Sequence, residues 1–338
     1  MRASLSLAGL KIKPGQQATI QVPVARLYTH TEMTMPVHVI HGYKDGPRLF
    51  VSAAIHGDEI NGTEIIRRLM KLKKIKKLKG ALIAVPVVNV YGFLQQSRYS
   101  PDRRDLNRFF PGSEKGSLTS QLANIFVDEI VANSTHGIDL HAGSNHRTNL
   151  PQIRANIKEP DTLRLAEAFR VPVIINANIR DGSLRQAVAD KGIPFLLYEA
   201  GEALRFDEVA IRAGIRGILS VMEAIGMLRH SRSRKKAVIA PLIADATTWV
   251  RAPTSGILQM NVPLGARVGQ AKKIGVIADP FGARETVVES PVSGMVIGRL
   301  NLPLVHQGDA VIHIAKLDRL AGIEPIMADF REDVIGEK

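Results

Sequence analysis

The stretch Leu49-Phe50-Val51-Ser52-Ala53-Ala54-Ile55-His56-Gly57-Asp58-Glu59 decides the fold of this chain. Its first part is apolar enough to form a buried strand, and residues 59–72 after it have helical periodicity. His56 and Glu59 stand where the strand ends and the helix begins, so their imidazole nitrogen and carboxylate oxygen can bind one metal ion. His141, which ends another short apolar run, offers a third ligand. The three residues predict a catalytic His₂Glu zinc site with one open position, although His-x-x-Glu alone is a common tetrapeptide.

Apolar, strand-like runs alternate with helical segments over the first two thirds of the chain. The strand-like runs are residues 49–55, 81–88, 137–140, 173–176 and 194–198, and the helical segments are residues 59–72, 118–131, 161–169, 182–190 and 207–228. Fully apolar strands between helices predict an α/β fold, in which helices cover both faces of a sheet. Residues 18–24 and 35–40 alternate in hydropathy and are predicted to be edge strands. The candidate ligands follow the carboxyl ends of predicted strands, where open α/β sheets place their sites.

The sequence changes character after residue 240. Ala252-Pro253-Thr254-Ser255-Gly256-Ile257-Leu258 recurs as Ser290-Pro291-Val292-Ser293-Gly294-Met295-Val296, and a glycine turn and an apolar run follow each copy. Two similar halves predict an all-β barrel-sandwich domain over residues 241–317, like that of biotinyl and lipoyl carriers. A carrier needs a lysine on the hairpin between the halves, but residues 279–289 contain none. We therefore expect a shielding lid or a domain that forms a homo-oligomer.

The chain is basic, with 45 Lys and Arg against 32 Asp and Glu and a formal net charge of +13. Part of this charge lies in residues 67–79, which we interpret as the solvated face of a helix, because few aromatic residues accompany the lysines for binding nucleic acid. Residues 229–236 are interpreted as an exposed linker. The predicted parts are an α/β domain at 1–230, a basic linker at 231–240, the β domain at 241–317 and a tail at 318–338.

Several classes of protein are disfavoured by what the 338 residues lack. Cysteine is absent, so any metal must be held by histidine and carboxylate side chains. No targeting segment is recognisable, and the longest apolar run, residues 81–88, is far shorter than the ~20 residues that a membrane-spanning helix needs. We therefore expect a cytoplasmic protein without a membrane partner. The Gly-x-Ser-x-Gly motif of serine hydrolases and the phosphate-binding loop of ATPases are also missing.

The loop at residues 97–112 carries side chains that suit recognition of a substrate. Asn107 and Arg108 form a pair that can bind a carboxylate, because a guanidinium group donates two parallel hydrogen bonds. Arg98 can polarise a scissile carbonyl group and stabilise its oxyanion, and Arg103 and Arg104 are alternatives for this role. Four motifs thus follow one another along the chain: His56-x-x-Glu59, Asp105-Leu106-Asn107-Arg108, Asp139-Leu140-His141 and Tyr198-Glu199-Ala200-Gly201.

The order of these motifs resembles the succinylglutamate desuccinylase/aspartoacylase family, whose members are relatives of the zinc carboxypeptidases. The resemblance covers about residues 47–226, and a following β domain is also typical of the family. It implies a carboxypeptidase-like mixed sheet and one zinc ion per chain. Carried over by position, it also implies these roles: zinc ligation by His56, Glu59 and His141, carboxylate recognition by Asn107 and Arg108, carbonyl polarisation by Arg98, and general-base catalysis by Glu199.

The predicted function is zinc-dependent hydrolysis of an amide bond in an N-acyl amino acid or a related substrate with a carboxylate group. Zinc acidifies its bound water and polarises the carbonyl group, and Glu199, partly desolvated at the end of an apolar strand, takes the proton and passes it to the departing amine. Glu202 is the alternative base, and residues 143–149 are expected to line the pocket. The main alternative function is a metallocarboxypeptidase that acts on short peptides. A catalytically inactive, basic nucleic-acid-binding protein is a further alternative.

Overall fold

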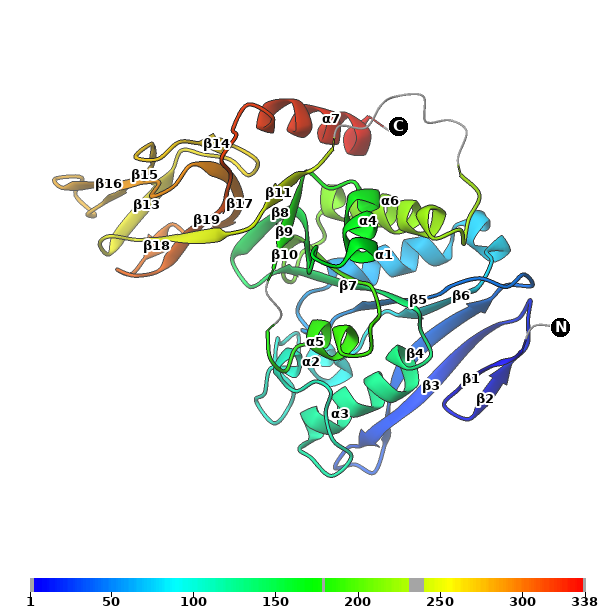
Figure 1. The fold of residues 1–338 in the computed structure, drawn as a ribbon. Helices are drawn as coiled ribbons and strands as arrows, with labels where there is room; N and C mark the ends of the chain where they lie inside the picture. The colour runs from blue at the N-terminus through cyan, green and yellow to red at the C-terminus, as the bar shows by residue number, and fades with distance from the viewer. Residues whose placement is uncertain (1–2, 178–179, 231–239, 337–338) are drawn as a thin grey trace.

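The computed structural model describes residues 3–177, 180–230 and 240–336. It is built around one mixed sheet of thirteen strands, in which strands far apart in the sequence lie side by side (Figure 1). In the α/β part the strands are, in spatial order, β8 (Arg147–Ala155), β10 (Phe195–Glu202), β7 (His136–Gly143), β5 (Arg48–Ala53), β6 (Ala81–Val85), β4 (Glu32–His41) and β3 (Gln17–Arg26), with β9 (Val173–Asn176) beside the end of β8. Strands β10, β7, β5 and β6 are parallel, whereas β8 and β4 are antiparallel to their neighbours β10 and β6.

Helices cover both faces of this sheet, as the sequence predicts. One face carries α1 (Asn61–Met70), α4 (Pro160–Phe169) and α6 (Glu208–Ala224), and the other carries α2 (Val90–Leu94), α3 (Leu118–Phe126) and α5 (Leu184–Ala189) (Figure 1). Side chains alternate along each strand, so β5 places Leu49 and Val51 in the core of the first face and Phe50 in the core of the second. Because both of its faces are buried, β5 has a mostly apolar sequence, Arg48-Leu49-Phe50-Val51-Ser52-Ala53, instead of one that alternates between apolar and polar residues.

Several smaller elements differ from the predicted ones. Strand β4 lies between β3 and β6, so of the two predicted edge strands only β3 is at an edge. The predicted helix at residues 118–131 ends as α3 at Phe126 and continues as a π-helical turn, Val127–Val131. The short elements outside these predictions include β1 (Leu5–Leu7), β2 (Leu10–Ile12), helix α2, and the 3₁₀ turns Lys73–Lys77 and Leu106–Arg108.

Strand β8 has no counterpart among the predicted strands, yet it lies inside the sheet. Its sequence, Arg147-Thr148-Asn149-Leu150-Pro151-Gln152-Ile153-Arg154-Ala155, is rich in polar residues and contains a proline, which both argue against a central strand. Strand β10 pairs along one edge of β8, and β17 (Gly294–Leu300) and β9 pair with the two ends of the other edge. These partners come from distant parts of the chain, so local sequence does not reveal the strand.

The carboxyl-terminal part is all-β, as predicted. Its strands are β12 (Thr247–Arg251), β13 (Gly256–Met260), β14 (Arg267–Val268), β15 (Lys273–Ala278), β16 (Glu285–Glu289), β17, β18 (Leu304–Val305) and β19 (Ala310–Lys316). Four of them form a separate sheet in the order β16-β15-β13-β18. The others extend the large sheet, because β17 pairs with β8, and β11 (Leu242–Ala244) pairs with β9. The large sheet thus contains strands from before residue 230 and from after residue 241, so the order of strands marks no domain boundary there. The predicted domain boundaries at residues 230 and 241 stay a prediction.

The segment predicted as a tail contains a helix, α7 (Ile323–Ile335), that packs on α6. Phe330 is buried in the core beneath α6, and the Arg216 guanidinium group lies 5.6 Å from the centre of its ring. Nη1 of Arg216 also lies 2.9 Å from Oδ2 of Asp333. Residues 318–338 are therefore part of the folded unit as far as they are described. The predicted linker at 231–240 lies, except for residue 240, outside the described residues.

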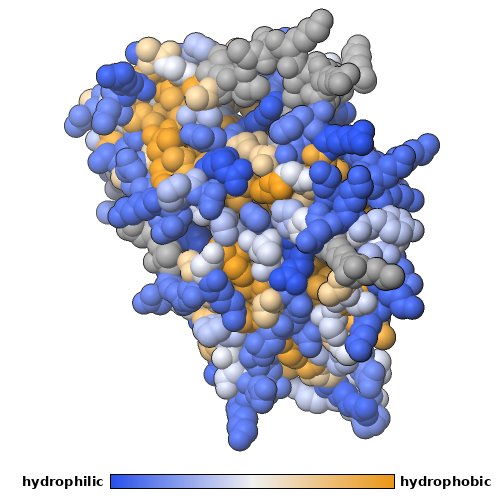
Figure 2. Space-filling view, turned by 45° about the vertical axis from the view of Figure 1, so that its right-hand side comes forward, coloured by the Kyte–Doolittle hydropathy of each residue, from blue (hydrophilic) through white to orange (hydrophobic). Residues whose placement is uncertain are grey.

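The basic helix α1 has the solvated face that its sequence predicts. Ile65 and Leu69 are buried against the sheet, while Arg67 and Arg68 form hydrogen-bonded ion pairs with Glu64. The surface seen in Figure 2 is mostly polar, and its apolar residues form small separate patches. Among the described helices, none is both long enough and apolar enough to cross a bilayer.

Candidate active site

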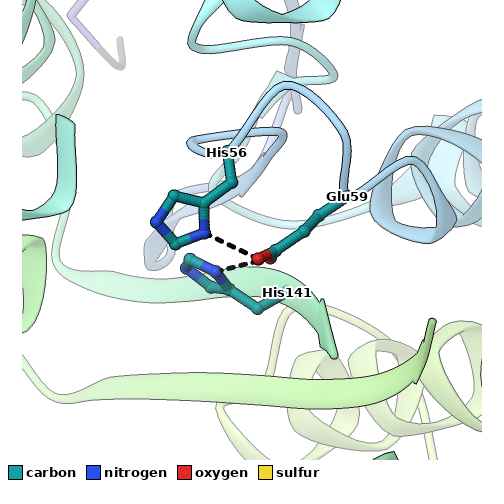
Figure 3. Close-up of side chains that lie close together, drawn as sticks. All are labelled: His56, Glu59 and His141. Atoms are coloured by element: carbon teal, nitrogen blue, oxygen red, sulfur yellow. Dashed lines mark hydrogen bonds and ion pairs between the residues drawn. The ribbon is translucent and has the colours of Figure 1, made fainter. Parts of the chain in front are cut away.

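His56, Glu59 and His141 form a buried cluster near the carboxyl ends of the central strands β5 and β7 (Figure 3). His56 and Glu59 lie in the loop between β5 and α1, and His141 lies in β7, which pairs with β5 in parallel. Nδ1 of His56 is 2.7 Å from Oε1 of Glu59, and Nδ1 of His141 is 2.8 Å from Oε2 of the same carboxylate. One ligand atom from each residue lies within 4.8 Å of the others, so the three could hold one metal ion.

The second nitrogen of each imidazole ring binds another carboxylate. Nε2 of His56 lies 3.0 Å from Oδ1 of Asp105, and Nε2 of His141 lies 2.7 Å from Oδ2 of Asp139. Metal-binding histidines usually donate their other N–H to such a carboxylate, which fixes the tautomer and directs the free lone pair at the ion. The donor set and its outer carboxylates therefore fit a divalent cation with nitrogen and oxygen ligands.

The electrostatics of the cluster favour a bound cation. Burial opposes charge on His141, but Asp139 and Glu59 outweigh it and hold the pKa of His141 well above its ordinary value. Burial likewise opposes charge on Glu59, yet His56 and His141 hold its pKa well below the ordinary value. The Glu59 carboxylate thus remains ionised in a buried place, where a divalent cation would compensate its charge.

Arg98 lies directly beside this cluster. Its Nη1 donates to Oε1 of Glu59 and its Nη2 donates to Oδ2 of Asp105, both over 3.1 Å. The alternatives Arg103 and Arg104 are exposed, and Arg104 donates to Asp102 instead. The structure therefore brings Arg98, rather than either alternative, to the cluster.

Asn107 and Arg108 belong to the same short turn as Asp105. The Asp105 carboxylate accepts a hydrogen bond from the backbone N–H of Asn107 over 3.0 Å, so one side chain shapes the turn and binds His56. Oδ1 of Asn107 accepts from the backbone N–H of Leu184 over 2.9 Å, which ties the turn to α5. Nη1 of Arg108 donates to the carbonyl oxygen of Asn107 over 2.5 Å, and the guanidinium group faces the cavity described below.

Glu199 lies opposite His141 on the neighbouring strand β10. Its Oε2 accepts a hydrogen bond from Nδ2 of Asn149 over 2.8 Å, and its Oε1 lies 3.9 Å from Nε of Arg154. Burial raises the pKa of Glu199 above its ordinary value, and nearby Arg154 and His141 oppose this. Strand β10 continues to Glu202, so the predicted end of this strand at residue 198 is wrong by four residues. Glu202 itself accepts from Asn301 and lies outside the cavity.

One cavity of about 710 Å³ is lined by all seven residues to which the sequence analysis assigned a role as metal ligand, substrate-binding group or catalytic group, leaving aside the alternatives it named. Those residues are His56, Glu59, Arg98, Asn107, Arg108, His141 and Glu199. Such a volume is typical of sites for small organic ligands. The cavity therefore unites a potential metal site, a buried carboxylate and carboxylate-binding groups in one place.

A model of the succinylglutamate desuccinylase/aspartoacylase catalytic domain matches residues 45–225, which is more than half of the chain. The chain belongs to this family. The family consists of deacylases, hydrolases that act on N-acyl amino acids. Membership agrees with the resemblance that the sequence motifs indicate.

Known relatives of this deacylase-family chain extend over most of its length. The N-alpha-acetyl-L-2,4-diaminobutyric acid deacetylase of Halomonas elongata is 26% identical over 284 residues, which are 81% of this chain and 83% of the relative. The crystal structure of a succinylglutamate desuccinylase/aspartoacylase from Rhodobacter sphaeroides is 24% identical, with a TM-score of 0.76 over 88% of this chain and 94% of that one. The product-bound ectoine utilization protein of Ruegeria pomeroyi is 22% identical, with a TM-score of 0.78 over 89% and 95%. These structures share the fold.

Part of the cavity wall of this family member was not predicted from its sequence. Residues 143–149 do line it in part, as expected, through Gly143, Ser144, Arg147 and Asn149. The arginines that sequence analysis gave no role are Arg147, Arg154, Arg180 and Arg185, which join Arg98 and Arg108 in the lining. Burial lowers the pKa of Arg185 to about 10, and the neighbouring Arg154 and Arg180 add to this effect. A cavity this rich in cations suits an anionic ligand.

The β domain contributes a further part of the wall. Trp249 of β12 and His313 of β19 are opposite each other in the sheet, and their rings stack with centres 4.4 Å apart. The Arg147 guanidinium group lies 5.5 Å from the centre of the Trp249 ring. Burial, with help from Arg154, lowers the pKa of His313 to about 3, so this ring is neutral. No local sequence signal marks these residues, because their proximity arises only when β17 and β19 join the large sheet.

Proposed function

We propose that this chain is a zinc-dependent hydrolase that cleaves the amide bond of an N-acyl amino acid or a similar small substrate with a carboxylate group. The observation that carries the proposal is the single cavity that contains the His56–Glu59–His141 cluster, Glu199 and Arg108 together. A cluster alone would fit a structural metal, but a structural site has four protein ligands and is closed. Here three ligands face an open cavity.

His56, Glu59 and His141 would hold one zinc ion through the two Nδ1 atoms and the carboxylate. When bound, zinc supplies a Lewis acid that polarises the carbonyl group and promotes deprotonation of water. Asp105 and Asp139 would keep both imidazoles in the tautomer that offers Nδ1 as a ligand.

Glu199 is the proposed general base. Burial raises the pKa of Glu199 towards neutral pH. A general base that must take a proton and then return it works best when its pKa is near the pH of the reaction. It accepts a proton from the attacking water and delivers it to the amine nitrogen as the carbon–nitrogen bond breaks. The products are a carboxylic acid, which ionises, and a free amine, so atoms and protons balance.

The remaining polar residues hold the substrate. Arg108, with Asn107 beside it, would bind the carboxylate of the substrate through a guanidinium fork. Arg98 already lies 3.1 Å from Glu59, so it is close enough to the cluster to stabilise an oxyanion on the scissile carbonyl. The relative from Halomonas elongata acts by name on N-alpha-acetyl-L-2,4-diaminobutyric acid, which carries the amide and carboxylate that this arrangement would recognise.

A screen of N-acyl amino acids and short peptides against the zinc-loaded protein tests the proposal, with release of the free amine as the readout. We expect turnover of an N-acyl amino acid, and turnover of peptides alone would instead support the metallocarboxypeptidase alternative. On the best substrate, Glu199→Gln should lower kcat by ~10²–10⁴, the usual contribution of general acid–base catalysis, without changing zinc content. Near-normal turnover by this variant would contradict the role of Glu199 and direct attention to Glu202.

A further inference from the structure

The proposed base is held by a side chain that the reaction itself does not require. Within the described residues, Asn149 is the one side chain that hydrogen-bonds the Glu199 carboxylate, through Nδ2 to Oε2 over 2.8 Å. Asn149 lies on β8, which pairs with β10, the strand of Glu199. A carboxylate has several rotamers, and a directed N–H donor selects among them.

The other side of the Asn149 amide faces the β domain. Asn149 pairs with Gly298 of β17, and a Cβ atom built on Gly298 would lie 2.9 Å from Oδ1 of Asn149. Real Cβ contacts are essentially never this short, so a larger residue at 298 would force a shift, and the Asn149 amide is the nearest group to it, followed by Cβ of His313 at 3.2 Å. Gly298 has an ordinary backbone conformation, so the need for glycine here comes from space and not from its φ angle.

Strand β17 is also fixed against β8, which carries Asn149, and against β10, which carries Glu199. Nδ2 of Asn301, in the loop after β17, donates to Oγ1 of Thr148 on β8 over 2.6 Å and to Oε2 of Glu202 on β10 over 2.9 Å. The backbone N–H of Asn301 donates to the carbonyl oxygen of His146 over 2.7 Å. The β domain thus meets β8 and β10 next to Asn149 and Glu199, at a defined register.

We propose that Asn149 is a positioning residue for Glu199, and that the β domain sets the position of Asn149 by placing Gly298 against its amide. This inference rests on the proposed role of Glu199 as the base. It gives the β domain a part in the reaction other than that of a carrier or a lid. The domain provides the rigid surface behind the side chain that directs the base.

The test compares variants in the full-length, zinc-loaded protein. Asn149→Leu keeps a branched side chain of similar size but donates no hydrogen bond, and Gly298→Ala adds the crowding methyl group. Gly269→Ala is the matched control, because a Cβ atom there meets nothing within 4 Å. For each variant, kcat and KM are measured with the substrate found in the screen. Zinc content and the midpoint of thermal unfolding are measured on the purified protein.

We expect Asn149→Leu to lower kcat by roughly 10²-fold, since small misplacements of catalytic groups have effects of this size, with KM and zinc content nearly unchanged. Gly298→Ala should lower kcat in the native background but have little further effect when combined with Asn149→Leu, because its target is then gone. Native kcat for Asn149→Leu would overturn the proposal. So would an equal effect of Gly298→Ala in both backgrounds, because the β domain would then act by another route.

A crystal structure of Gly298→Ala separates this inference from the proposed function. If the native protein hydrolyses no substrate in the screen, the proposed function fails, but the geometry can still be judged. We expect the Asn149 amide to have turned and its hydrogen bond to Glu199 to be broken. A retained bond near the native 2.8 Å would overturn the inference whatever the activity.

Discussion

The metal cluster and the core of the β domain are both buried, but they consist of opposite kinds of side chain. His56, Glu59 and His141 are 2–4% exposed, and each is hydrogen-bonded to at least one charged partner. The core of the β domain is an apolar cluster that includes Ile274 and Val296, both of which are fully buried. Burial stabilises the apolar side chains of the β domain, whereas it opposes ionisation of the three side chains in the metal cluster. Changes in the cluster should therefore alter function more than folding, and changes in the β core should do the reverse.

The largest expected effect is the loss of metal on substitution of a ligand. His141→Ala should reduce zinc from about one ion per chain to a small fraction and abolish turnover, because two ligands rarely hold zinc tightly. Zinc is measured by atomic emission on dialysed protein, and unfolding by circular dichroism. The matched control is His313→Ala, which removes a buried histidine of the same cavity from the β domain and should leave zinc content unchanged. Full zinc retention by His141→Ala would refute the ligand assignment.

A smaller effect, on stability, is expected in the β core. Ile274→Ala should lower the free energy of unfolding by about 2–5 kcal/mol, the range for such truncations in tightly packed cores. Urea denaturation followed by fluorescence measures this change. Zinc content and kcat of the folded fraction should stay near native, because Ile274 lies in the separate four-stranded sheet and outside the cavity.

Val287→Ala provides the control for that experiment. Val287 is on β16 of the same sheet but is 44% exposed, so its truncation should change stability by no more than about 0.5 kcal/mol. If both variants lose equal stability, the apolar core as described does not account for the stability of this domain. If Ile274→Ala loses zinc while still folded, the two regions are not as independent as their composition indicates.

The smallest expected effect is a dependence of stability on acid at helix α1, where the buried carboxylate of Glu64 pairs with the more exposed side chains of Arg67 and Arg68. Hydrogen bonds from Arg67, and then from Arg68, lower the pKa of Glu64 from 4.5 to about 2. A carboxyl group whose pKa is lower in the folded state contributes stability that is full above pH 4.5 and is lost as the pH falls towards 2. Glu64→Gln should thus be less stable than native protein at pH 6 and nearly equal to it at pH 2. If the difference in unfolding free energy between native protein and Glu64→Gln does not decrease as the pH falls, the proposed ion pairs of Glu64 with Arg67 and Arg68 are contradicted.

The sequence was most informative where function depends on residues close together in the chain or on one residue type. The interval from Leu49 to Glu59 predicts strand, helix and two metal ligands, because a buried strand must be apolar and its end must hold the polar groups. The turn Asp105 to Arg108 is also local, and two of its residues, Asn107 and Arg108, line the cavity. The absence of lysine from the hairpin at 279–289 argues against a carrier role without any structure.

Sequence alone thus determined the candidate metal ligands, the α/β class and the all-β carboxyl-terminal part, since each depends on short-range patterns of apolar and polar residues. Only the tertiary structure decided that β8 is a central strand, that β17 extends the same sheet, and that α7 packs on α6. Asn149 and Arg154 look like ordinary polar residues until β8 is placed beside Glu199. Gly298 resembles any turn glycine until its strand is placed beside Asn149. These roles are decided by contacts between residues about 50 to 150 positions apart, and no local pattern of hydropathy encodes such contacts.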